Sequence, residues 1–143
     1  MARAVLLAAL MLAYLFAAAA GASPAQDYML YCMGCHGPEA QGVPGKIPPL
    51  AGALPRYMRT PEGRNYVLRV PGAANSALSD AQLAAVLNWL ATTYAVSGET
   101  VPPAFSAEEV TKVRHQPLAS VLATRSAVIQ ALSASGPAPA PSY

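Results

Sequence analysis

The sequence of 143 residues is poor in charge, cysteine and histidine. Aspartate, glutamate, lysine and arginine together make up 11% of it, and its formal net charge is +2. A balance this close to neutrality does not predict a nucleic-acid partner, because binding to the phosphate backbone requires a concentration of basic side chains. The length predicts one domain with terminal tails, since a domain commonly takes ~100–150 residues.

The first 22 residues are predicted to be a signal peptide. Arg3 supplies a positive charge, residues 4–20 are apolar, and Ala20-Gly21-Ala22 places small residues at the expected cleavage site. An uncleaved membrane anchor is the alternative, but the run is alanine-rich and marginal against the ~20 apolar residues of a spanning helix. No cysteine stands at the cleavage site to carry a lipid. The mature chain is expected to begin near Ser23, without a membrane anchor, in an oxidising compartment. Loss of Arg3 leaves eight basic residues against seven acidic ones.

Both cysteines and one of the two histidines lie in a single pentapeptide, Cys32-Met33-Gly34-Cys35-His36. A structural zinc site needs about four ligands, and the only other histidine, His115, leaves such a set incomplete. A thioredoxin-like dithiol has this cysteine spacing but belongs to an α/β fold. Covalent haem uses the whole motif, because two thiols add to the porphyrin vinyl groups and the next imidazole binds the iron. The motif therefore favours haem c.

Helical periodicity and helix-start signals predict an all-α chain with long loops. The strongest helix begins at Ser79, which forms a capping box with Gln82, and ends at Ser97-Gly98. Residues 37–61 are too rich in glycine and proline for a long element. Further helices are predicted from Pro24 toward the cysteines, from Pro61 to Pro71-Gly72, from Ser106 over Val110 and Val113, and over residues 118–132.

The motif and its surroundings resemble class I c-type cytochromes. CMGCH follows a short helix with Tyr28 and Tyr31, and LSDAQLAAVLNWLATTY is similar to the family's C-terminal core helix, which crosses the N-terminal one. The likeness covers residues 26–96 and implies a cytochrome c-like helical fold around one covalent haem. It also implies thioether bonds to Cys32 and Cys35, with His36 as the proximal iron ligand. The expected organisation is a signal peptide (1–22), a haem domain (23–97), a helical extension (98–135) and a flexible Pro/Ala-rich tail (136–143).

The second axial ligand is where the sequence departs from that family. The resemblance places a methionine in the loop before the last core helix, but residues 69–80, RVPGAANSALSD, contain none. Of the methionines that remain after cleavage, Met29 and Met33 stand one turn before the motif and inside it, so neither easily reaches the opposite face of the ring.

Met58 is therefore the expected distal ligand, 22 residues after His36. The alternatives are His115, a weak ligand such as Asn75, or no protein ligand. The axial ligand affects the reduction potential of the iron, and an open position allows small molecules to bind.

Basic residues predominate between residues 46 and 69, where Glu62 is the only acidic residue. A solvated surface is the simplest interpretation, and a docking patch is the alternative. Three of the arginines could instead pair with haem propionates, since guanidinium matches carboxylate geometry. Trp89 and Tyr94 could line the haem edge or belong to the core. The basic residues are Lys46, Arg56, Arg59, Arg64 and Arg69, the propionate candidates being the last three.

The sequence predicts a periplasmic monohaem electron carrier and not an enzyme. Its expected partners are redox proteins: a dehydrogenase that donates electrons, and a cytochrome or an oxidase that accepts them. The stretch GRNYVLRVPG is more weakly similar to small exported cytochromes associated with periplasmic dehydrogenases. Two alternatives stay open. The missing loop methionine allows a haem protein with an open distal site, and residues 98–143 allow a cytochrome subunit of a periplasmic oxidoreductase complex.

Overall fold

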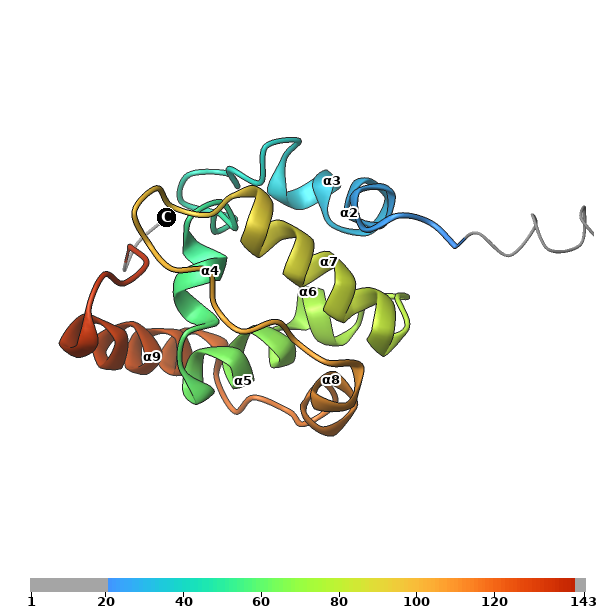
Figure 1. The fold of residues 1–143 in the computed structure, drawn as a ribbon. Helices are drawn as coiled ribbons and strands as arrows, with labels where there is room; N and C mark the ends of the chain where they lie inside the picture. Colours follow the sequence, from blue (N-terminus) through green and yellow to red (C-terminus); the bar gives the residue numbers. More distant parts are fainter. Residues whose placement is uncertain (1–20, 141–143) are drawn as a thin grey trace, which may run out of the picture.

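The computed structural model describes residues 21–140, and every regular element in that range is a helix. The one extended pairing there is an isolated bridge between Val43 and Ile47, so the all-α prediction is confirmed. The elements are α2 (Pro24–Tyr31), α3 (Met33–His36), α4 (Ala53–Tyr57), α5 (Pro61–Arg69), α6 (Pro71–Ala74), α7 (Asp80–Thr93), α8 (Ala107–Val113) and α9 (Val121–Ser135) (Figure 1). Most of the predicted signal peptide, residues 1–20, lies outside the described residues. Within residues 21–140 no helix has both the length and the apolar character needed to cross a membrane.

The helices α2 and α7 begin at similar signals. At the start of α7, Ser79 and Gln82 cap each other as predicted. Ser23 and Gln26 form a second capping box at the start of α2, where Pro24 occupies the first helical position. Each box satisfies backbone N–H groups that the first helical turn leaves without partners.

The contact between α2 and α7 holds together the two ends of the predicted haem domain. The rings of Tyr28 and Trp89 lie 5.6 Å apart between centroids. The side-chain amide of Gln82 donates a hydrogen bond to the buried carboxylate of Asp27, at 3.3 Å. Trp89 also packs edge-on against Tyr94, at 6.3 Å between centroids. An aromatic and a polar contact therefore fix α2, which leads directly into the cysteine motif.

The long loop after the motif contains a helix that the sequence did not predict. α4 begins after Gly52, which has a left-handed conformation with φ of 67°. Its Pro55 stands in the first turn, where the missing N–H removes no intrahelical hydrogen bond. Leu54 and Tyr57 are buried, so tertiary packing supports a helix that composition disfavours. A second difference lies at Pro71, which ends α5 as predicted but also opens the short helix α6.

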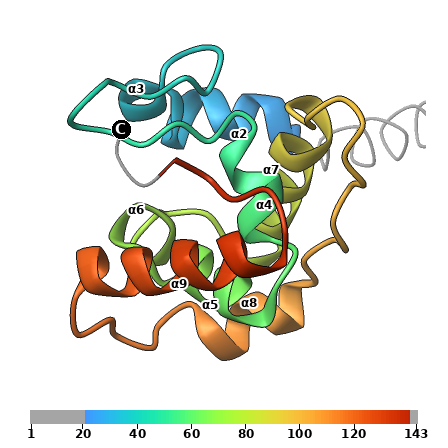
Figure 2. The ribbon, with the colours of Figure 1, turned by 90° about the vertical axis from the view of Figure 1, so that its left-hand side faces the viewer.

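Residues beyond 97 fold back onto the rest of the chain. α8 packs against α7, and α9 packs against α5 and α4 (Figures 1 and 2). Val128, Ile129 and Leu132 of α9 are buried. Ser120 caps α9, which begins a few residues later than predicted. The apolar face of the predicted extension is thus used within the molecule.

Glu99 holds the start of the extension against α4. Nη2 of Arg56 lies 2.8 Å from Oε1 of Glu99, and Arg59 forms an ion pair with the other carboxylate oxygen. The hydrogen bond from Arg56, together with that from Arg59, keeps the pKa of the Glu99 carboxyl below its usual range. Two of the arginines expected on a solvated or docking surface therefore have partners inside the chain.

Arg64 and Arg69 fasten the segment around α8 in the same way. Nη2 of Arg64 lies 2.5 Å from Oε2 of Glu109, and its guanidinium stacks over the ring of Phe105 at 4.1 Å. Nε of Arg69 donates to the carbonyl oxygen of Gln116 at 2.8 Å. These arginines use their donors on the extension, which differs from the expectation of a solvated face, a docking patch or a propionate partner.

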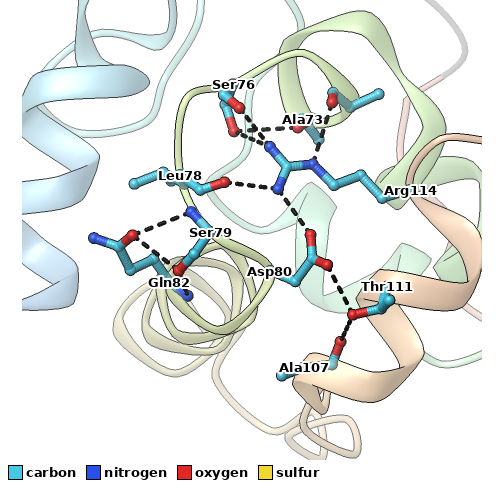
Figure 3. A network of polar contacts seen from close by, with 10 residues as sticks. Ala73, Ser76, Leu78, Ser79, Asp80, Gln82, Ala107, Thr111 and Arg114 are labelled. Atoms are coloured by element: carbon cyan, nitrogen blue, oxygen red, sulfur yellow. Dashed lines mark hydrogen bonds and ion pairs between the residues drawn. The ribbon is translucent and has the colours of Figure 1, made fainter.

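Arg114 is the most deeply buried of these cations, with 3% of its surface exposed. It reaches from the end of α8 to the loop before α7, where it donates to the carbonyl oxygens of Ala74, Ser76 and Leu78 at 3.2, 2.5 and 2.7 Å (Figure 3). The same guanidinium pairs with Asp80 at 2.9 Å. One side chain of the extension thereby fixes three successive turns of a loop that has no regular ladder of its own.

The predicted flexible tail makes contacts as far as the structure describes it. Ala138 packs against the core, Pro139 is buried, and the Ala138 carbonyl oxygen accepts a hydrogen bond from Arg56 at 3.3 Å. Arg125 donates to the Ala140 carbonyl oxygen at 3.0 Å. Residues 136–140 therefore lie against the folded chain, while residues 141–143 lie outside the described range.

We predict that Arg114→Met lowers the free energy of unfolding by about 3 kcal/mol or more. Methionine matches the unbranched shape but leaves the three loop carbonyls without a charged donor in a buried place. The measurement is urea unfolding of the purified protein followed by circular dichroism. Lys112→Met is the matched control, because the Lys112–Glu108 pair is exposed and such pairs contribute little. Equal losses in the two variants would contradict the role assigned to Arg114.

We also predict that Tyr28 makes stability depend on pH in the alkaline range. Burial, followed by the nearby Tyr94 and Cys32, raises the pKa of Tyr28 to about 12 from 10.0. Because the folded state favours the neutral phenol, this stabilisation is present below pH 10 and is lost as the pH rises toward 12. Tyr28→Phe removes the titration. The advantage of the wild type over the variant should therefore shrink between pH 10 and 12 in urea unfolding. A difference that stays constant across this range would disprove the prediction.

Candidate cofactor site

The cysteine motif lies at the junction of α2 and α3. Cys32 stands between the two helices, and α3 carries the rest of the motif to His36. Both cysteines are free thiols, Cys32 half-buried and Cys35 exposed. Burial, together with the nearby charges of Asp27 and Cys35, raises the pKa of the Cys32 thiol. Two protonated, accessible thiols one helical turn apart are the groups that thioether formation requires.

The imidazole of His36 is held in one tautomer. Its Nδ1 lies 3.0 Å from the carbonyl oxygen of Pro48. A carbonyl oxygen only accepts hydrogen bonds, so Nδ1 carries the proton and the lone pair is on Nε2. Burial lowers the pKa of His36, against the opposing effect of the Pro48 hydrogen bond. A neutral imidazole with a free Nε2 is the form that binds a metal ion, and its second nitrogen is oriented as metal-binding histidines require.

The loop that supplies Pro48 is itself fixed by backbone hydrogen bonds. The N–H of Gly42 donates to the His36 carbonyl oxygen at 2.8 Å, and that of Leu50 donates to the Ala40 carbonyl oxygen at 2.8 Å. Gly42 has φ of 69°, and a Cβ there would overlap the backbone of the 47–48 segment. The loop therefore turns back on itself next to the motif and presents a carbonyl oxygen to the imidazole.

Tyr28 and Tyr94 hold the outer part of this loop. The Tyr28 hydroxyl donates to the Gly37 carbonyl oxygen at 2.5 Å, and the Tyr94 hydroxyl donates to the Pro38 carbonyl oxygen at 3.3 Å. The contact between α2 and α7 thus also positions the segment that follows His36. Sequence reasoning assigned Tyr94 to the haem edge or the core and gave no role to the Pro48 carbonyl.

The proposed distal ligands do not come together in the structure. Met58 is 1% exposed and packs in the core at the end of α4. Asn75 and His115 are exposed and line one pocket of about 280 Å³ beside α6. Arg69 also lines that pocket, whereas none of the CMGCH residues does. Within residues 21–140, no three histidine, cysteine or acidic side chains meet as a metal-binding cluster.

A single cofactor explains this combination of groups better than a bare metal ion. The motif offers two thiols and one oriented imidazole, which is too few ligands for structural zinc. The same three groups match the covalent and coordinate bonds of haem c. The residues present therefore fit that group on their chemistry and on the tautomer of His36.

The comparisons with known proteins agree with this fit. A family model described as cytochrome c matches residues 22–94. Cytochrome c-552 of Thermus thermophilus is 36% identical over 116 residues, which cover 66% of this chain and 88% of the relative. The cytochrome c-552 of a named strain of the same species is 36% identical over 116 residues, or 78% of its length. Since 66% of 143 residues is about 94, some 22 positions of the 116 have no counterpart in this chain.

Members of this family carry electrons by means of a haem c that is covalently attached through a CxxCH motif. The present chain has one such motif, ending in an imidazole with its Nε2 free. From its family match, its helical fold and this site, the chain belongs to the cytochrome c family as a class I monohaem c-type cytochrome, an electron carrier.

Proposed function

We propose that this protein passes single electrons in the periplasm from a dehydrogenase to a cytochrome or an oxidase. In this proposal Cys32 and Cys35 carry the two thioether bonds and His36 binds the iron through Nε2. The observation that carries the assignment is the hydrogen bond from His36 Nδ1 to the Pro48 carbonyl oxygen, at 3.0 Å. The bound haem supplies a one-electron couple, and the protein supplies its position and surroundings.

The chain's own residues would keep this couple rigid. Tyr28 and the 37–52 loop fix the imidazole, and buried side chains of α2 and α7 exclude water beside it. Electron transfer is fast when ligands barely move between oxidation states, so a preorganised site suits a carrier. Localisation in the periplasm rests on the predicted signal peptide, residues 1–22, and on the outer-compartment chemistry of haem attachment.

Apolar side chains around the motif offer a docking surface for a redox partner. We call Met29, Leu30, Tyr31 and Val43 the motif patch; all four are exposed, and they flank the exposed Cys35. Two of the six large exposed apolar residues of the described chain, Val101 and Leu122, lie elsewhere. Redox partners usually form small, transient interfaces, and a few apolar side chains near the cofactor edge are enough for one.

The extension supports a carrier more than a subunit that clamps a partner enzyme. Its apolar residues on α9, Val128, Ile129 and Leu132, are buried against this chain's own helices. Its ion pairs with Arg56 and Arg64 are likewise internal. The described part of the extension therefore offers a partner mainly polar surface.

Haem attachment is tested by expressing the full chain in a host that exports and matures cytochromes c. We expect one haem c per chain by the pyridine haemochrome assay and a mass increase that survives denaturation. Cys35→Ala should leave one thioether and shift the haemochrome band to longer wavelength, and Cys32→Ala with Cys35→Ala should abolish covalent haem. Met33→Ala, in the same loop, is the control and should keep full attachment. A wild-type protein that is purified without haem would refute the proposal.

Docking is tested by charge substitution at two equally exposed leucines. Leu30 in the motif patch is 71% exposed and Leu122 on α9 is 69% exposed. Leu30→Glu should slow the bimolecular electron exchange with a redox-protein partner by about tenfold, about 1.4 kcal/mol, because it places a charge in the apolar contact. Leu122→Glu should leave the rate unchanged, and both should keep the wild-type potential. Equal rates for the two variants, in stopped-flow measurements, would show that docking occurs elsewhere.

A further inference from the structure

The loop before α7, residues 70–79, presents only carbon to the interior. Val70, Ala73 and Leu78 are the loop residues that pack against the core. α6, which forms the middle of the loop, lies below α3 in both ribbon views, on the side away from the cysteine motif (Figures 1 and 2). None of these three side chains has an atom that binds iron, so the loop offers no inward-facing ligand.

The polar side chains of the same loop face other partners. Asn75 lines the pocket on the side of α6 that faces the extension, together with His115, Gln116 and Leu118. The hydroxyl of Ser76 is hydrogen-bonded to Arg114 at 2.9 Å. Since no residue of the CMGCH motif lines this pocket, Asn75 and His115 are placed away from the motif.

The methionines give no distal ligand either. No methionine follows Met58 in the sequence, and Met58 is 1% exposed among core side chains. Cys32, Cys35 and His36, by contrast, all keep accessible surface, as groups that bind a large external molecule must. Met29 is 57% exposed on α2, and Met33 lies within the motif. We therefore assign Met58 to the core, in contrast to its expected role as distal ligand.

We infer that the protein leaves the distal position of its haem without a side-chain ligand, and that this position binds a small uncharged diatomic molecule. The inference rests on the proposed haem attachment. Carbon-only walls disfavour a charged ligand, because nothing there compensates its desolvation. Arg114 points its donors at three carbonyl oxygens and Asp80, so it is not free to act on a bound peroxide. Ligand binding, rather than peroxidase chemistry, is the activity that this arrangement supports.

The test is carbon monoxide titration of the dithionite-reduced holoprotein, followed by visible absorption. We expect saturable binding of one carbon monoxide per haem. The oxidised protein should lack the weak absorption band, at the red end of the visible range, that marks a bond between methionine sulfur and iron. Met58→Leu conserves the volume of the core side chain, and it should bind carbon monoxide with an unchanged midpoint. His115→Ala should behave in the same way.

Each other outcome overturns the inference in an identifiable way. A red-end band that disappears in Met58→Leu would make Met58 the ligand. A wild type insensitive to carbon monoxide that becomes sensitive in His115→Ala would assign His115. Insensitivity in all three proteins would show that some other group closes the site. A coloured, redox-active protein that does not bind carbon monoxide refutes this inference alone, whereas a protein without haem refutes the proposed function as well.

Discussion

The hydrogen bond between His36 Nδ1 and the Pro48 carbonyl oxygen is the constraint on which the site depends. It selects the neutral tautomer, places the lone pair on Nε2 and orients the ring. These effects require the 37–52 loop to return beside the motif, which the Gly42 turn and the Ala40 carbonyl bonds achieve. They also require α2 to be held firmly, since the motif continues directly from it. The crossing of α2 and α7 therefore serves the imidazole as much as it serves the core.

The arginines show how a chain of low charge uses its cations. Arg56, Arg64, Arg69 and Arg114 are separated from their partners by 34 or more residues in sequence. They fasten an extension that would otherwise expose an apolar helix face. Because their charges are matched within the molecule, they add little to a long-range field that could steer a partner. Recognition near the cysteine motif is then left mainly to apolar contact, which salt affects less than charge pairing.

Local signals made part of this structure predictable. Ser79 with Gln82 specified the start of α7 within three residues, and CMGCH specified the cofactor chemistry by residue type and spacing alone. What could not be predicted depends on distant contacts. The Pro48 carbonyl is a main-chain group with no sequence signature, and α4 forms against the local preference because Leu54 and Tyr57 find a core. Met58 illustrates the same limit, since a methionine that fills a core and one that binds iron look alike in sequence.

The loop before α7 joins these features. In the family resemblance this loop is tied to the cofactor by a methionine, and a bond to iron would also hold the loop in place. Here Arg114 holds it, through the carbonyl oxygens of Ala74, Ser76 and Leu78. The anchor comes from the extension and lies on the side of α6 away from the motif. A loop secured in this way no longer needs a ligand for its own stability. The extension and the inferred open coordination position are therefore two parts of one structural arrangement.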